Sequence, residues 1–189
     1  MSKQSKETCK NKLLYFSPSE DNSSYFTNSL IYVCEHNLEG SMGLIINRTI
    51  NIKTDDLFKS LDLQLSSNPF QDKLLMGGPV NPGAVFVLHP TLGKWESTIS
   101  VNDEISLSTS KDILESIASG QGPDKYLITL GYSGWSAGQL DFELTENTWI
   151  IAPAKYEIIF DTRVEDKVAG VSKELGFDLT MVSPDYGNA

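Results

Sequence analysis

The chain of 189 residues lacks the long apolar runs from which membrane helices are built. A transmembrane helix needs about 20 consecutive, mostly apolar residues, and no segment approaches that length. The first twelve residues are polar, and the apolar segment 13–16 that follows is too short for the core of a signal peptide. These absences argue against a membrane protein and predict a cytoplasmic one.

Cysteine and basic charge are also scarce. Two cysteines, Cys9 and Cys34, are too few for a disulfide framework, so we expect two reduced thiols in the cytoplasm. The 15 Lys and Arg residues are outnumbered by 25 Asp and Glu residues, which gives a formal charge of −10. Proteins that grip phosphate backbones need a field of basic side chains, so this charge argues against nucleic-acid binding.

The chain does contain many short apolar segments separated by turn residues. In the first half they follow one another at hairpin spacing, as segments 30–34 and 42–46 do on either side of a loop that holds Gly40. In the second half they alternate with helical patterns such as the one that begins at Val164 and ends at Leu175. This order predicts an α+β fold with a mostly antiparallel or mixed β-sheet and helices packed on it.

The length is that of one ordinary domain. Polar residues at both ends predict an N-terminal tail over residues 1–12 and a C-terminal tail over residues 179–189. We expect the single domain to occupy residues 13–178 between them.

The most distinctive stretch runs from Tyr126 to Trp149. Its apolar residues 127–130 predict a buried strand, and the glycine-punctuated residues 131–135 predict a tight turn. Ser136 is a good N-cap for a helix that follows at once, and Gln139 can complete a capping box.

The same turn resembles the nucleophile elbow of hydrolases. Gly131-Tyr132-Ser133-Gly134-Trp135 follows G-x-S-x-G except at its fifth position, where the elbow needs a small residue. The base would be one of the two histidines, His36 or His89. The alternative interpretation is that Ser133 and the glycines only shape a tight turn while Trp135 packs.

We predict no metal and no cofactor. Cys34, Glu35 and His36 could ligate a metal, but a structural zinc needs four ligands and no second pair lies at suitable spacing. Gly77-Gly78-Pro79 lacks the Lys and the Ser or Thr of a phosphate-binding loop. Residues 131–138 lead into a predicted helix N-terminus, which attracts anions, and Arg48 could add charge there.

Several segments together carry a family resemblance. They are Tyr32 to Asn37, Gly40 to Arg48, Gly77 to Val80, Val87 to His89 and Leu130 to Leu140, followed by Glu143, Leu144, Asn147, Trp149, Ile159 to Asp161 and the final helix with Leu175-Gly176. In sequence and order they resemble the YqgE/AlgH family from about residue 13 to residue 178. Thr49, Asp141, Arg163 and Val168 depart from the family pattern, in which Pro, Glu, Pro and Trp are usual.

The resemblance implies a compact single-domain α/β-type fold in a cytosolic bacterial protein. It implies no established enzymatic activity, although some members carry the label of transcriptional regulator. We therefore expect a ligand- or protein-binding module with a regulatory role rather than an enzyme. The alternatives are a hydrolase with Ser133 as nucleophile and a transcriptional regulator.

A binding module needs a cleft, and the family motifs suggest where it would be. Most of them end at turns, so turns that meet at one edge of the sheet would line a cleft for a small anionic ligand or a partner protein. The residues predicted to line it are Asn47, Arg48, Gly77, Gly78, His89, Ser133, Gly134 and Trp135.

Overall fold

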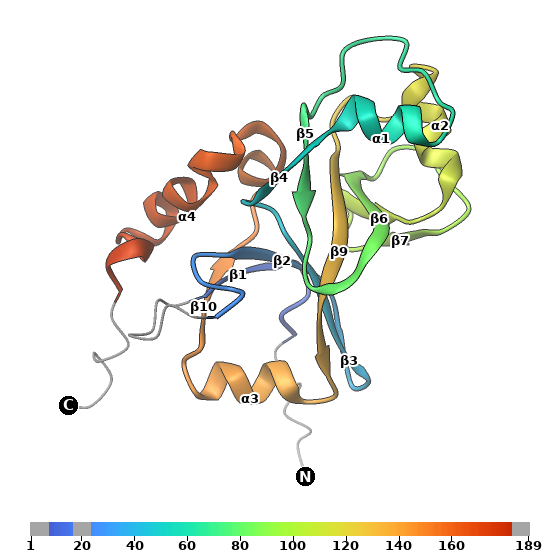
Figure 1. Cartoon of the computed structure of the whole chain (residues 1–189). Helices are drawn as coiled ribbons and strands as arrows, with labels where there is room; N and C mark the ends of the chain where they lie inside the picture. Colours follow the sequence, from blue (N-terminus) through green and yellow to red (C-terminus); the bar gives the residue numbers. More distant parts are fainter. Residues whose placement is uncertain (1–7, 17–23, 183–189) are drawn as a thin grey trace, which may run out of the picture.

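The computed structural model describes residues 8–16 and 24–182, and in this part of the chain ten strands form one curled, mostly antiparallel sheet (Figure 1). The strands are β1 (Lys12–Phe16), β2 (Leu30–Asn37), β3 (Gly40–Ile45), β4 (Thr49–Lys53), β5 (Lys73–Met76), β6 (Val80–Pro90), β7 (Thr98–Ser100), β8 (Ile105–Ser108), β9 (Leu127–Ser136) and β10 (Trp149–Pro153). Their order is β10-β1-β2-β3-β9-β6-β8-β7, while β5 pairs with β9 and β4 with β5. The predicted α+β fold is confirmed.

The long strand β9 joins the two halves of this sheet. Its first part pairs with β6 on one edge and runs parallel to β5 on the other, as in the pairs Leu130–Val85 and Leu130–Met76. Its last part, residues 133–136, pairs with β3. Gly131 lies between the two parts with a φ of +69°, a left-handed conformation that glycine adopts readily and other residues rarely do. The chain thus changes partners where β9 changes backbone conformation.

Four α-helices cover the sheet in the described residues: α1 (Thr54–Ser60), α2 (Lys111–Ala118), α3 (Gln139–Thr145) and α4 (Lys167–Leu175). In Figure 1, α1 and α2 lie near one end of β9, α3 lies at its other end, and α4 lies beside the half that contains β10. A π-helical turn (Glu157–Asp161) and two 3₁₀ turns (Val164–Asp166 and Leu179–Met181) flank α4.

Each helix buries an apolar face over its own part of the core. Phe58 of α1 and Ile113 of α2 belong to one cluster of buried side chains. Leu140 of α3 packs with Trp135 and Trp149 in a second cluster. Val171 of α4 joins the largest cluster, on the half of the sheet that contains β1 and β2. These apolar contacts, rather than long regular helices, fix the positions of the short helices.

The predicted strand, turn and helix at residues 127–139 differ from the structure. No tight turn follows residue 130, because β9 continues through residues 131–135 to Ser136. The helix begins at Gln139, and its N-cap is Gly138 with a φ of +73°, so Ser136 does not cap it. Half of the predicted capping box is present, since the Ser136 backbone N–H donates to Gln139 Oε1 over 3.0 Å.

The ordered structure extends beyond the predicted domain boundaries at both ends. Cys9 is buried, and the Asn11 N–H donates to the carbonyl oxygen of Val33, although both residues fall in the predicted tail. At the other end Leu179, the first residue of a 3₁₀ turn, is fully buried. The burial of Leu179 therefore extends the ordered structure by one turn beyond the predicted C-terminal boundary at residue 178. Residues 1–7 and 183–189 of the predicted tails lie outside the described residues.

No helix among the described residues combines the length and the apolar character needed to cross a membrane.

Candidate functional site

The glycines at residues 77 and 78 allow two backbone segments to touch. A Cβ atom on Gly77 would lie 2.1 Å from the carbonyl oxygen of Gly131, and one on Gly78 would lie 2.2 Å from the Tyr132 carbonyl group. The Gly77 carbonyl oxygen accepts hydrogen bonds from the Ile45 N–H over 2.9 Å and from Ser133 Oγ over 3.1 Å. The segment after β5 is therefore held against β3 and β9 by close backbone contacts at Gly77 and Gly78 and by the Ser133 hydrogen bond. Ser133 is fully buried at this contact.

Asn47 and Arg48 hold the loop that precedes β2. The Asn47 side chain accepts from the Leu30 N–H over 2.8 Å and donates to the Asn28 carbonyl oxygen over 2.9 Å. Arg48 donates to the carbonyl oxygens of Tyr25 and Thr27, and its guanidinium also stacks on the Tyr25 ring. The polar ends of both side chains thus have structural partners, and Arg48 donates to this loop and to Ser29 Oγ.

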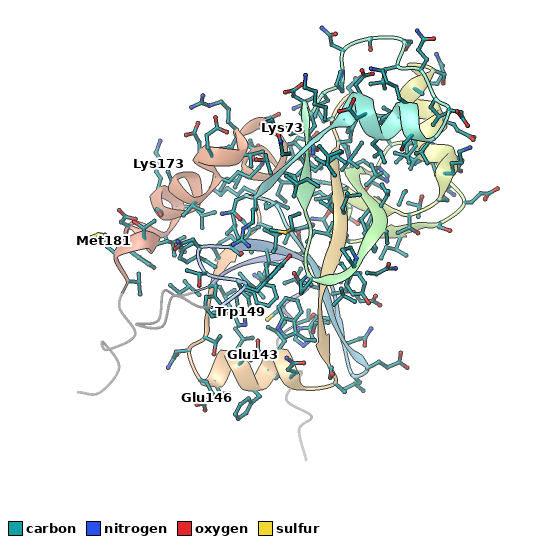
Figure 2. The ribbon with its side chains drawn as sticks, viewed as in Figure 1. Lys73, Glu143, Glu146, Trp149, Lys173 and Met181 are labelled. Carbon is teal, nitrogen blue, oxygen red and sulfur yellow. The ribbon has the colours of Figure 1, made fainter. Side chains whose placement is uncertain are left out.

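Trp135 belongs to a clamp that fixes α3 on the sheet. Its indole N–H donates to Glu143 Oε2 over 2.9 Å, and the Trp149 indole N–H donates to the same oxygen over 2.7 Å. The two indole rings meet edge to face with centroids 5.7 Å apart. Figure 2 shows the Glu143 side chain on α3 near Trp149 of β10. The Trp135 side chain is therefore used in packing, while its backbone remains part of β9.

His89 lies in a different part of the molecule. It is on β6 beyond the last pair with β9, which joins Leu88 to Leu127. Trp135 lies eight residues further along β9 (from 127 to 135), a span of roughly 26 Å in a straight strand. His89 is fully buried, and its ring meets Trp95 edge to face. The eight predicted residues therefore do not line one cleft: the group around Gly77 and Ser133 is brought together, and His89 is not.

The geometry of a serine hydrolase is missing at Ser133. Its hydroxyl donates to a carbonyl oxygen and is fully buried in a strand, whereas an elbow presents the serine at an exposed turn. The hydroxyl that does meet a histidine is that of Ser108, 2.8 Å from His89 Nε2. Since His89 Nδ1 lies 2.8 Å from the Pro90 carbonyl oxygen, Nδ1 is the donor and Nε2 accepts from Ser108. Ser108 and His89 are both fully buried, which leaves no access for a substrate.

The candidate metal ligands Cys34 and His36 have other partners in the structure. Cys34 is fully buried, burial raises the pKa of its thiol, and the thiol contacts the Tyr32 carbonyl oxygen. His36 Nδ1 accepts from the Cys9 N–H over 2.8 Å, and its Nε2 lies 3.6 Å from Asp141. The described residues contain no group of three or more His, Cys, Asp or Glu side chains arranged to hold a metal ion.

A hollow of about 620 Å³ lies beside the last part of β9. Its apolar lining comes from Met42 of β3, from Val80 and Phe86 of β6, and from Tyr132 of β9. The Phe86 and Tyr132 rings meet edge to face with centroids 5.5 Å apart. Among the described residues, its charged lining consists of Glu35 and Glu39, and no Lys or Arg lines it; Gly134 and Trp135 are the two predicted site residues that border it.

One edge of β9 is open where it borders this hollow. Pairing with β6 ends at Tyr132, so residues 133–136 pair only with β3 in the described chain. Peptide groups of successive residues point to opposite edges of a strand. The Ser136 N–H points at Gln139 rather than at β3, so the N–H and C=O of Gly134, two residues earlier, also point away from β3. Gly134 is exposed, and its peptide groups face the open edge.

Sequence reasoning placed only Gly134 and Trp135 at this hollow and missed the rest of its lining. Met42, Val80 and Phe86 looked like ordinary strand residues, because nothing in their local pattern shows that the pairing of β6 with β9 ends at Tyr132. The exposed acidic residues Glu35 and Glu39 flank the predicted hairpin loop and were a usable signal. Two carboxylates near a glycine-rich strand indicate a site that disfavours anions.

The curled sheet, its helices and this hollow define a single-domain α+β protein with a candidate binding site and no recognisable catalytic centre among the described residues. The chain belongs to the AlgH-like family, whose model matches residues 13–180. It is 40% identical to a UPF0301 protein from Dechloromonas aromatica over 87% of this chain and 89% of that protein. It is 41% identical to a UPF0301 protein from Shewanella woodyi over 95% of this chain and 97% of that protein.

Solved structures agree with this assignment. The solution structure of the AlgH protein from Pseudomonas aeruginosa superposes with a TM-score of 0.78 at 35% identity, and the match covers 100% of both chains. A crystal structure of a protein from Corynebacterium diphtheriae superposes with a TM-score of 0.62 at 18% identity over 82% of this chain and 81% of that one, which shows the fold alone. The sequence resemblance to the family is thereby confirmed. None of these names describes an activity, so a function has to be argued from geometry.

Proposed function

We propose that this protein is a non-catalytic binding module that takes an extended peptide segment of a partner protein along the open edge of β9. The observation that carries the proposal is the coincidence of unpaired peptide groups at Gly134 with the 620 Å³ hollow beside them. In β-strand addition, main-chain hydrogen bonds to a free edge give affinity, and adjacent pockets select side chains.

The side chains that line the hollow indicate which residues a bound peptide would carry. Met42, Phe86 and Tyr132 offer an apolar floor for one large side chain of the peptide. Glu35 and Glu39 favour a Lys or Arg beside it, since no positive side chain of residues 8–16 and 24–182 lines the hollow and could neutralise them. A protein partner therefore fits this surface better than the small anionic ligand that the sequence suggested.

The proposal is tested by selecting binders from a random ten-residue peptide library on the full-length protein. The bound peptide is then mapped by backbone amide NMR. We expect basic-plus-aromatic peptides to be enriched and the exchange of the Gly134 amide hydrogen to slow at least tenfold on binding. Enriched peptides that leave the Gly134 amide unchanged, or the absence of any enrichment, would reject the proposal.

Charge reversal supplies the specificity test, with a matched control. The double variant Glu35→Lys and Glu39→Lys is expected to lose at least tenfold in affinity for the selected basic peptides, because attraction at the hollow becomes repulsion. Glu146→Lys changes an exposed carboxylate on α3's C-terminal side that does not line the hollow, and it should bind like the wild type. Equal losses in both proteins would show a long-range charge effect only.

The other predicted functions have weaker support. Hydrolysis at Ser133 lacks an exposed nucleophile and a base within reach. Direct binding to DNA conflicts with the charge of −10, so a regulatory role would act through the protein partner. That role and a cytoplasmic location stay predictions.

A further inference from the structure

A second cavity, away from β9's open edge, contains a lysine that is buried without a counter-ion. Lys167 opens α4 and is only 1% exposed. Its ammonium group donates to the carbonyl oxygens of Ile158 and Ile159, which lie in the π-helical turn 157–161. An ammonium group has three N–H donors, so one remains without a protein acceptor among the described residues.

The charges around Lys167 already have partners of their own. No carboxylate of the described chain forms an ion pair with it, and Asp161, whose charge acts on it, pairs with Lys125. Glu165 pairs with Arg163, which also pairs with Asp166. Burial lowers the pKa of Lys167 to about 8, and the charge of Asp161 offsets only part of that effect.

Lys167 borders a cavity of about 670 Å³, a volume in the range of small-molecule sites. The cavity lies between the start of β9 and the turns that precede α4. Phe70, Leu127, Phe160 and Val164 form its apolar wall, and the charged side chains of Asp161, Arg163, Glu165 and Lys167 also border it. Lys73 and Asp72, both exposed, stand among the lining residues, and Figure 2 shows Lys73 on the ribbon near the turns beside α4.

We infer that this cavity binds a small organic carboxylate, with the carboxylate on the Lys167 ammonium group and an apolar body against Phe160 and its neighbours. One buried cation with a free donor matches one carboxylate. The apolar walls match a hydrocarbon body, and phosphate, which has none, should bind less well. This site is independent of the peptide edge proposed above and shares no lining residue with its hollow.

The test uses the full-length protein with hexanoate, octanoate and benzoate as probes and with inorganic phosphate for comparison. Isothermal titration calorimetry should show saturable binding of at least one carboxylate and weaker binding of phosphate. Lys167→Met, which keeps the length of the side chain but removes the charge, should weaken that binding at least tenfold. Lys173→Met changes an exposed lysine of the same helix outside the cavity and should stay within twofold of the wild type (Figure 2).

A measurement on the wild type keeps the test decisive if Lys167→Met does not fold. In protein labelled at lysine side chains, NMR titration should show the pKa of Lys167 rising by at least one unit when the carboxylate is bound, because an anion stabilises the ammonium form. Binding without that rise places the ligand elsewhere and overturns the inference. Failure of all three carboxylates to bind, or equal affinity of Lys167→Met, overturns it as well.

Discussion

Removing the Glu143 carboxylate should loosen α3 more than removing any other acidic side chain on that helix. Glu143 Oε2 accepts from two indole N–H groups, those of Trp135 and Trp149, and Oε1 accepts from Gln139. Both indole side chains are nearly buried, at 6% and 5% exposure. In Glu143→Ala the two donors lose their acceptor, and water can reach them only through the half-buried space that the carboxylate vacates.

The magnitude follows from these two bonds. A hydrogen bond to a charged group contributes about 1.5–3 kcal/mol, so two would give about 3–6 kcal/mol if both donors stayed unsatisfied. Because Glu143 is half-buried, water replaces part of this loss, and we expect a decrease of about 2–3 kcal/mol in the free energy of unfolding. For a domain of this size that lowers the melting temperature by about 5–10 °C.

Urea unfolding followed by tryptophan fluorescence and by circular dichroism measures the change. Glu146→Ala is the matched control, because Glu146 lies at the C-terminal end of the same helix with its side chain exposed (Figure 2). It should stay within about 0.5 kcal/mol of the wild type, as surface substitutions usually do. If Glu143→Ala were as stable as Glu146→Ala, the hydrogen bonds from Trp135 and Trp149 to Glu143 would not hold α3 on the sheet.

Three further outcomes test other parts of the structure. Gly77→Ala should destabilise by about 2–3 kcal/mol in urea unfolding, because its Cβ would lie 2.1 Å from a backbone oxygen, whereas Gly83→Ala, which meets nothing within 4 Å, should not. The pKa of Lys167 is lowered, so the folded state binds fewer protons than the unfolded state between about pH 8 and 10.5, and stability should rise with pH there. Relative to Lys167→Met, the wild type should gain about 1.5 kcal/mol between pH 8 and 9.5. A fluorophosphonate probe should leave Ser133 unlabelled in the folded protein, and labelling there would contradict its burial.

Much of the fold could be predicted because its elements carry strong local signals. Segment 30–34 is continuously apolar and β-branched, and it lies inside β2. The helix expected after Val164 forms as a 3₁₀ turn followed by α4, and it ends at Gly176 in the left-handed conformation that favours glycine. Periodicity and terminating glycines are properties of a few neighbouring residues, so they can be interpreted without the tertiary structure.

The candidate site was harder because it depends on pairing between distant segments. Residues 131–135 have the composition of a turn, yet pairing with β3 on one edge and with Val80 on the other keeps them within β9. Asn47 and Arg48 look like site residues by type, but their partners lie in a loop some twenty positions earlier. Neither the strand partners of β9 nor the position of His89 in the fold can be predicted from the neighbouring residues in the sequence.

The sharing of β9 between two half-sheets has a consequence for the newly made chain. Gly43 pairs with Ser133, so β3 leaves the ribosome 90 residues before its partner (133 − 43). At a synthesis rate of about 5–20 residues per second, this interval lasts roughly 5–20 s. During that time β3 can pair with β2 on one edge, but its other edge stays open, and chaperones that shield such edges have a defined window in which to act.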